Sequence, residues 1–146
     1  MAYNPMSDEE VRAFLAGLPP RTAKLATVRA DGRPHVAPVW YDFFDDDGSL
    51  VFTTGESTVK GRNMLRDPRA SVCVDDDRPP FSFVVVEGVA EIDDDPGEVR
   101  RWATRIGGRY MGAERAEEYG TRNGVPGELV VRLRPTRVTS ARDVAD

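Results

Sequence analysis

The sequence contains very little histidine or cysteine, with one residue of each, His35 and Cys73. A single cysteine cannot form a disulfide within the chain, and the two residues together cannot build a His/Cys metal cluster, so we expect no metal site. The segment around Cys73, residues 70–74, has strand character. A lone cysteine in such a strand is expected to pack in the core as a small apolar residue.

Long apolar runs are also absent, which excludes a transmembrane helix. Near the N-terminus, residues 8–10 are acidic where a secretory signal would need basic residues. Together these features predict a cytoplasmic protein that does not associate with membranes.

The composition is that of an ordinary globular chain. With 146 residues, of which 40% are hydrophobic and 31% charged, we expect one domain over residues 1–146 with its own core. The formal net charge of −5 argues against a nucleic-acid partner, because neutralising phosphates requires a coherent basic face.

Hydrophobic periodicity predicts a mainly β protein with short helices. Alternating apolar residues favour strands at 23–28, 35–44, 50–54, 70–75, 81–92 and 128–140. Helical spacing, capping residues and proline stops favour helices at 8–18, 57–67, 96–106 and 113–122. Gly88 is expected to bend the strand at 81–92, and this many antiparallel strands in a small domain favour a barrel over a sandwich.

One segment, residues 51–67, has the features of a binding site. Its strand ends in two hydroxyl residues, Thr53 and Thr54, and the helix that follows has Ser57 or Thr58 as its N-cap. Hydroxyl donors at a strand end and free backbone N–H groups at a helix start are suited to a phosphate.

The charge of this segment supports the same interpretation. Lys60 and Asn63 are three residues apart, hence neighbours on one helical face. Residues 53–66 contain three basic residues, Lys60, Arg62 and Arg66, and one acidic residue, Glu56, although the chain as a whole is acidic. The alternative is an amphipathic surface helix whose basic residues are simply solvated.

An ordered set of motifs extends over most of the chain. The motifs are Leu25-Ala-Thr-Val28, Asp31-Gly-Arg-Pro-His-Val36, Pro38-Val-Trp40, Leu50-Val-Phe-Thr-Thr54, Lys60-Gly-Arg-Asn63 and Asp67-Pro-Arg-Ala70. This set resembles the split-barrel flavin/deazaflavin oxidoreductases of the pyridoxamine-5′-phosphate-oxidase-like superfamily. Within it, the pattern is most similar to the actinobacterial class that binds the deazaflavin coenzyme F-420. The resemblance implies a six-stranded antiparallel split β-barrel, of the FMN-binding type, that forms a homodimer with a cofactor groove at each side of the interface.

The resemblance also implies roles for individual residues. Those matching the strand that lies against the tricyclic ring are Pro38, Val39 and Trp40. Those matching the phosphate cradle are Thr53, Thr54, Ser57, Lys60, Arg62 and Asn63. Trp40 is equally compatible with a half-buried core position. His35 invites a proton-donor role, although an imidazole beside a hairpin is more often a surface or interface residue.

The implied activity is hydride transfer from the reduced deazaflavin to a small conjugated or electron-poor acceptor. An FMN-binding oxidoreductase of the same fold and a non-catalytic binder of the cofactor or of an anionic metabolite are the alternatives. The oligoglutamate tail of F-420 would require further cations, for which Arg33, Arg62, Arg66 and Arg78 are candidates. Vitamin-B6 oxidation is not expected, because pyridoxamine-phosphate oxidase proper has histidine ligands in its C-terminal segment and residues 140–146 contain none.

Overall fold

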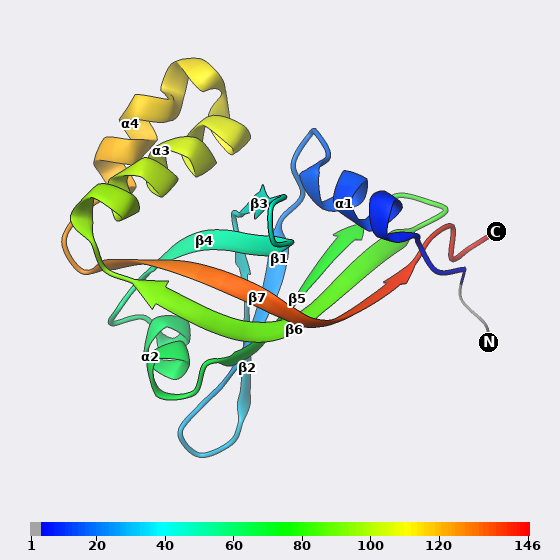
Figure 1. The fold of residues 1–146 in the computed structure, drawn as a ribbon, viewed down its shortest axis with the longest axis horizontal. Coiled ribbons are helices and arrows are strands. Elements are labelled where there is room, and N and C mark those ends of the chain that lie inside the picture. Colours follow the sequence, from blue (N-terminus) through cyan, green and yellow to red (C-terminus); the bar gives the residue numbers. More distant parts are fainter. Residues whose placement is uncertain (1–3) are drawn as a thin grey trace.

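Seven strands form one antiparallel sheet in the computed structural model, which describes residues 4–146 (Figure 1). The strands are β1 (Ala23–Val28), β2 (Pro34–Val39), β3 (Asp42–Phe44), β4 (Ser49–Gly55), β5 (Arg69–Asp76), β6 (Ser82–Asp93) and β7 (Glu128–Ala141). The helices are α1 (Asp8–Ala16), α2 (Val59–Arg66), α3 (Pro96–Met111) and α4 (Ala116–Asn123), with a 3₁₀ turn, η1, at Ala113–Arg115. No helix within residues 4–146 is long and apolar enough to cross a membrane.

The sheet is curled into a half-barrel (Figure 1). Its strand order is β2-β1-β5-β6-β7-β4-β3, and every neighbouring pair is antiparallel. Strands β2 and β3 stand at the two ends of this order but follow one another in the chain. The chain therefore crosses from one end of the sheet to the other at residues 40–41.

The prediction of six strands is wrong, because segment 35–44 does not form one strand. It breaks after Val39, so that β2 pairs with β1 whereas β3 pairs with β4. At the break, the Tyr41 N–H donates to the Tyr110 hydroxyl at 3.2 Å, and the Tyr41 hydroxyl donates to the Leu15 carbonyl at 2.6 Å. These partners belong to α3 and α1, so local alternation could not indicate the break.

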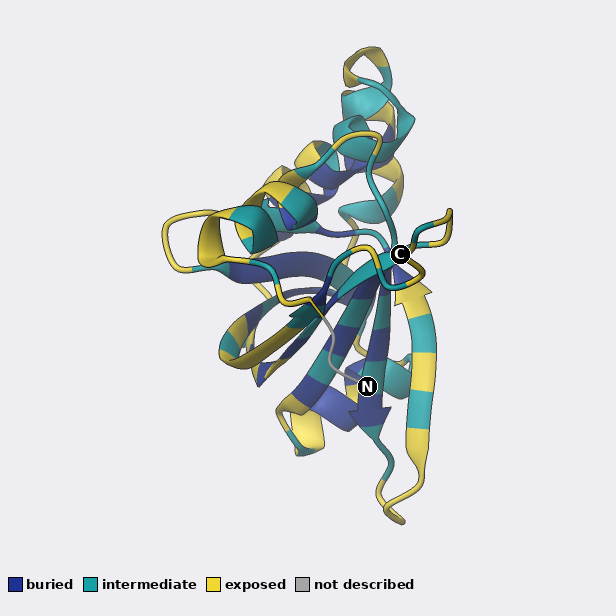
Figure 2. Cartoon of the chain, turned by 90° about the vertical axis from the view of Figure 1, so that its right-hand side faces the viewer, coloured by how far each residue is buried: buried dark blue, intermediate teal, exposed yellow. Residues whose placement is uncertain are grey.

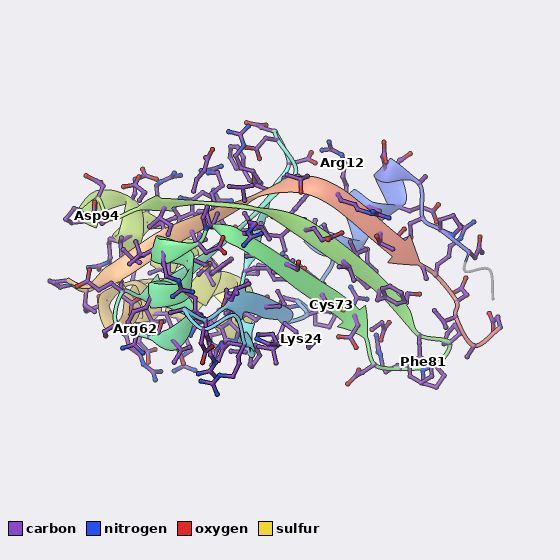
Figure 3. The ribbon with its side chains drawn as sticks, turned by 90° about the horizontal axis from the view of Figure 1, so that it is seen from below. Arg12, Lys24, Arg62, Cys73, Phe81 and Asp94 are labelled. Carbon is purple, nitrogen blue, oxygen red and sulfur yellow. The ribbon has the colours of Figure 1, made fainter. Side chains whose placement is uncertain are left out.

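The strands show alternating bands of buried and less buried residues (Figure 2). Leu25 on β1 and Val72 and Val74 on β5 are at most 1% exposed. Cys73 lies between these two valines and pairs in register with Lys24, so it points to the opposite face and is only half-buried (Figure 3). The prediction of a core cysteine is therefore wrong, since the register of β5 assigns the buried face to its neighbours.

Strand β6 bends at Gly88, as predicted. The pairing of β6 with β7 shifts register between Glu87 and Gly88. A Cβ atom at Gly88 would lie 2.2 Å from the Arg134 carbonyl oxygen. Only glycine therefore permits the two backbones to approach this closely at the bulge.

Helices α3 and α4 form a hairpin at one end of the sheet, above β4 and β7 in Figure 1. The contact with the sheet is made by Val99, Trp102 and Ile106 from α3 and by Val51 and Val130. Gly107 lets α4 approach closely, because a Cβ atom there would lie 2.3 Å from the Tyr119 Cβ. The hairpin is thus a rigid wall on one side of the strand ends.

The helix bounds differ from prediction at several ends. Helix α1 ends at Ala16, and Leu18, which was expected inside it, is 74% exposed. Helix α2 covers 59–66 rather than 57–67, while α3 continues to Met111. The start of α2 follows from its local cap, because the Thr58 side chain accepts from the Gly61 N–H.

Candidate functional site

A pocket of about 390 Å³ lies where β2, β4 and β7 meet α2 and the α3–α4 hairpin. From the predicted site it brings together Pro38, Val39, Trp40, Thr53, Thr54, Thr58 and Lys60. Its further lining residues are Gly55, Ala103, Ile106, Asn123 and Glu128. The ring-contact strand and the phosphate segment, separate in the sequence, therefore share one pocket.

The start of α2 is organised by Thr58. Its hydroxyl donates to the Gly55 carbonyl at 2.7 Å and accepts from the Gly61 N–H at 3.1 Å, which makes Thr58, and not Ser57, the N-cap. The Thr54 hydroxyl lies 3.1 Å from the Thr58 hydroxyl. The helix can sit on this loop because a Cβ at Gly61 would lie 2.1 Å from the Gly55 carbonyl oxygen.

This arrangement leaves donors for an anion. The N–H groups of Val59 and Lys60 precede the first bond of the helix, which runs from Arg62 N–H to Thr58 carbonyl at 2.9 Å. The Lys60 ammonium makes no ion pair or hydrogen bond with any residue of the described chain. An unpaired lysine beside two free amides is an arrangement suited to a phosphate group.

Trp40 contributes an aromatic ring to the lining of the same pocket. Its ring stacks on Tyr110 with centroids 5.0 Å apart and planes 5° apart, and the Tyr119 ring lies 5.8 Å away. Tyr110 is itself fixed by its hydroxyl, which donates to the Arg21 carbonyl at 2.6 Å. Trp40 is half-buried, so it belongs both to the packing of the hairpin and to the pocket lining.

Four residues proposed for the site from the sequence do not line the Lys60 pocket. Asn63 is only 4% exposed and donates to the Thr27 hydroxyl at 3.0 Å, so it joins α2 to β1. Arg62 points away from the Lys60 pocket, and Ser57 is exposed and lines neither that pocket nor its neighbour. His35 pairs in register with Thr27 and does not line the Lys60 pocket either.

Arg62 and Asn63 line a second pocket, of about 360 Å³, between α2 and the β1–β2 hairpin. Its arginines are Arg29, Arg33, Arg62 and Arg66. Arg33 pairs with Asp31 at 2.8 Å, and Arg66 donates to the Val28 carbonyl. Figure 3 shows Arg62 at the end of the molecule opposite Phe81. We refer to this second site as the arginine pocket.

The cations of α2 differ from those elsewhere in the protein. Within residues 4–146, the basic side chains with neither a carboxylate at ion-pair distance nor an aromatic ring beneath them are Lys60, Arg29, Arg62 and Arg66. Arg78, also a candidate from the sequence, pairs with Asp76 and lines a different pocket. The basic side chains that have neither kind of partner are therefore grouped around α2 and the adjacent β1–β2 hairpin.

Sequence reasoning missed the residues contributed by the hairpin and by β7, of which Glu128 is the charged one. Glu128 pairs in register with Gly55, a contact between strands far apart in the sequence. Burial raises the pKa of the Glu128 carboxyl, and the positive charge of Lys60 opposes this shift. No local motif marks Glu128, because only the pairing of β4 with β7 brings it to the pocket.

The curled antiparallel half-barrel places hydroxyl groups and a lysine without an ion pair at a strand–helix junction, an arrangement suited to an anion. Residues 7–141 match the family profile of pyridoxamine 5′-phosphate oxidase, and the chain belongs to that family. The oxidoreductase-like superfamily suggested by the motifs is thereby confirmed.

The curated relatives match this chain over only part of their own length. A pyridoxine/pyridoxamine 5′-phosphate oxidase of Rhizobium johnstonii is 44% identical over 54 residues, which are 37% of this chain and 26% of that protein. The corresponding protein of Burkholderia multivorans is 36% identical over 100 residues, 68% of this chain and 42% of that protein. The chain thus spans less than half the length of these relatives.

Solved structures match over most of the chain. A conserved hypothetical protein of Mycobacterium tuberculosis, Rv2991, has a TM-score of 0.82 and 30% identity, with 100% of this chain and 92% of that chain covered. A protein described as an F-420 reductase has a TM-score of 0.67 and 28% identity, covering 87% of this chain and 94% of the other. An FAD-binding protein of Mesorhizobium loti, at 22% identity and a TM-score of 0.66, shares the fold. Similarity to these structures therefore does not decide whether this chain binds a flavin or a deazaflavin.

Proposed function

We propose that the protein is an oxidoreductase that binds the deazaflavin coenzyme F-420 and transfers hydride to a small conjugated or electron-poor acceptor. The observation that carries the proposal is the concentration of unpaired cations around α2, beside a pocket with a tryptophan wall. The likeness to the F-420 reductase supports the same cofactor class.

The residues of the Lys60 pocket fit the phosphate and ring of such a cofactor. Lys60 and the amides at the start of α2 would hold the phosphate through charge-assisted hydrogen bonds. Pro38, Val39 and Trp40 would form the wall beside the ring. When bound, the reduced cofactor supplies a hydride, and the protein's part is to hold donor and acceptor in register and exclude water.

The arginine pocket fits the part of F-420 that FMN lacks. The tail of F-420 carries several carboxylates, and Arg29, Arg62 and Arg66 have no carboxylate at ion-pair distance within residues 4–146. Guanidinium groups are well suited to carboxylates because their fork of donors matches two oxygens. The two pockets lie on neighbouring parts of α2, so one ligand could extend from Lys60 to the arginines.

FMN is the second candidate cofactor. The Lys60 pocket is complete for one phosphate without the arginine pocket, since the two have no lining residue in common. A ligand with a single phosphate and no tail therefore satisfies the first site. In that case the arginines would be a solvated surface.

A homodimer is part of the proposal. The outer face of the sheet leaves Val36 at 66% and Val89 at 41% exposure. A hollow of about 550 Å³ on this face includes Val89 and Gly88 in its lining. A second copy of the chain would bury these apolar side chains, whose exposure to water is unfavourable. Light scattering at micromolar concentration should give twice the mass of one chain, and a monomer would contradict this part.

Titration with both cofactors tests the proposal. Reduced and oxidised F-420 and FMN would each be added to the purified protein while absorbance and fluorescence are followed. We expect tighter binding of F-420, oxidation of the reduced form by an added electron-poor acceptor, and little peroxide. Equal or tighter FMN binding would replace the deazaflavin assignment by the FMN one. Binding with no turnover on a broad acceptor panel would leave a cofactor-binding protein.

A further inference from the structure

Glu128 is held firmly at the edge of the Lys60 pocket. It is the first residue of β7 and pairs with Gly55, the last residue of β4. The turn before it is fixed by two backbone bonds, from Glu128 N–H to the Val125 carbonyl at 3.2 Å and from Glu56 N–H to the Gly127 carbonyl at 2.8 Å. Gly127 has φ of +91°, which favours glycine. The backbone position from which the Glu128 side chain extends is thus fixed.

The side chain of Glu128 faces the helical hairpin rather than the interior of the half-barrel. Side chains two residues apart on a strand share a face, and Val130 packs against Trp102 and Ile106 of α3. Residues opposite one another on paired strands also share a face. Thr53 is opposite Val130, so its side chain lies on the same face of the sheet as that of Glu128. The pocket that Lys60 and the hairpin line therefore also carries a carboxylate.

This carboxylate has no hydrogen-bond donor from the protein. Within residues 4–146 it makes neither a hydrogen bond nor an ion pair, and Lys60 is the charge that acts on it. Elsewhere, carboxyl groups such as those of Asp67 and Glu118 have lowered pKa values because arginines donate to them, whereas burial raises that of Glu128. A partly desolvated acceptor without a donor is unfavourable, and a ligand that supplies donors relieves it.

We propose that Glu128 selects a hydroxylated chain beside the bound phosphate, by accepting hydrogen bonds from the hydroxyl groups between phosphate and ring. The inference rests on the proposed function, because F-420 and FMN both carry a polyhydroxylated ribityl chain at this place. A second anion there would be repelled by the carboxylate, and an apolar chain would leave it without a donor. Glu128 is thus a specificity-determining residue for the chain, while Lys60 provides the attraction for the phosphate.

Small phosphate esters test this without the ring. Ribitol 5-phosphate and n-pentyl phosphate differ in the hydroxyl groups, and O-phosphoethanolamine offers an ammonium instead. Their dissociation constants would be measured by ligand-observed NMR with the full chain. We expect the wild type to bind ribitol 5-phosphate about tenfold more tightly than pentyl phosphate, in line with a hydrogen bond to a charged group.

Variants locate the effect on Glu128. Glu128→Ala should remove the preference for ribitol 5-phosphate and leave pentyl phosphate bound equally well or better. Glu128→Gln retains one carbonyl acceptor and should keep part of the preference. Glu56→Ala is the matched control, because Glu56 is an exposed carboxylate in the adjacent loop that does not line the pocket. It should leave the preference unchanged.

The outcomes separate this inference from the proposed function. An unchanged preference in Glu128→Ala, or tighter binding of ribitol 5-phosphate by that variant, would overturn the role of Glu128 even if F-420 or FMN binds. Stronger binding of O-phosphoethanolamine than of ribitol 5-phosphate would also overturn it, in favour of an ammonium partner. If the polyol preference depends on Glu128 but neither cofactor binds, the inference stands and the proposed function fails.

Discussion

The two ends of the half-barrel differ in how their polar groups are paired. At the α1 end, the Ser7 and Glu10 side chains form a capping box, Glu10 pairs with Arg142 at 2.6 Å, and the Tyr41 hydroxyl donates to the C-terminal turn of the helix. At the α2 end, Lys60 and Glu128 share a pocket without an ion pair or a hydrogen bond to each other. At the first end these groups are paired within the protein, although the Nε atoms of Arg109 and Arg142 are buried without a partner in residues 4–146. At the second end Lys60 and Glu128 retain donors and acceptors for a ligand.

This difference separates stability from binding. Paired groups contribute to folding but have little left to offer to a ligand, and unpaired charges do the reverse. Substitutions of paired or buried groups at the α1 end should therefore change the free energy of unfolding and not cofactor affinity, and substitution of an unpaired charge such as Lys60 should do the opposite.

The largest effect is expected for Leu15→Ala at the α1 end. Leu15 is 2% exposed in the main core, and truncating such a leucine costs about 2–5 kcal/mol through lost burial and the cavity left behind. Urea denaturation should show this loss, while cofactor affinity of the folded variant stays that of the wild type. Leu18→Ala, at a 74% exposed position, is the control and should be nearly neutral. A loss of cofactor affinity in folded Leu15→Ala would contradict the separation of stability from binding.

Lys60→Ala should weaken cofactor binding by about 1.5–3 kcal/mol, the range for hydrogen bonds to charged groups. Fluorescence titration measures this, and the unfolding midpoint should not fall, because Lys60 makes no ion pair in the described chain. Lys24→Ala is the matched control, since Lys24 pairs with Asp75 at 2.6 Å outside the pocket. Unchanged affinity in a folded Lys60→Ala protein would remove Lys60 from the site.

Thr58→Ala should affect both properties, because Thr58 caps α2 and lines the pocket. Loss of a threonine N-cap costs about 1 kcal/mol of stability, and the loosened helix start should also weaken phosphate binding. Thr58→Ser retains the hydroxyl and should restore both. If Thr58→Ser behaves like Thr58→Ala, the hydroxyl is not the group responsible.

The smallest effects are expected in the arginine pocket. Arg62→Ala should weaken F-420 binding by roughly 0.2–1 kcal/mol, because the contacts of an exposed guanidinium with the tail are screened by solvent. The loss should shrink as salt is raised and should be absent for FMN, which has no tail. Arg134→Ala, at an arginine paired with Glu91, is the control. Equal losses for both cofactors would place Arg62 at the phosphate instead.

Much of the site was predictable because its signals are local. A strand ending in Thr53-Thr54, a cap at Thr58 and a lysine in the first turn of the helix are set by residues within a few positions of one another. Gly88 also marked its bulge correctly, since glycine in a strand of this length indicates a close approach. Local steric and hydrogen-bonding preferences suffice for such features.

Other features depended on contacts between distant segments. Asn63 shares helix α2 with Lys60, yet it bonds to Thr27 instead of lining the Lys60 pocket. Trp40 is positioned by Tyr110 and Tyr119, two rings of the helical hairpin. Spacing along one helix gives the angle between side chains, but not which neighbouring element each side chain meets.

By itself the sequence determined the mainly β character, the order of the elements and the hydroxyl- and lysine-bearing segment around Lys60, since periodicity, capping and charge are local properties. The tertiary structure alone decided that strand 35–44 breaks in two, that Cys73 faces outward and that Glu128 enters the pocket. Each of these follows from strand register or from pairing between segments far apart in the chain, such as Gly55 with Glu128. A shift of one residue in register reverses which side chains are buried, and the energy that fixes the register comes from the whole packed core.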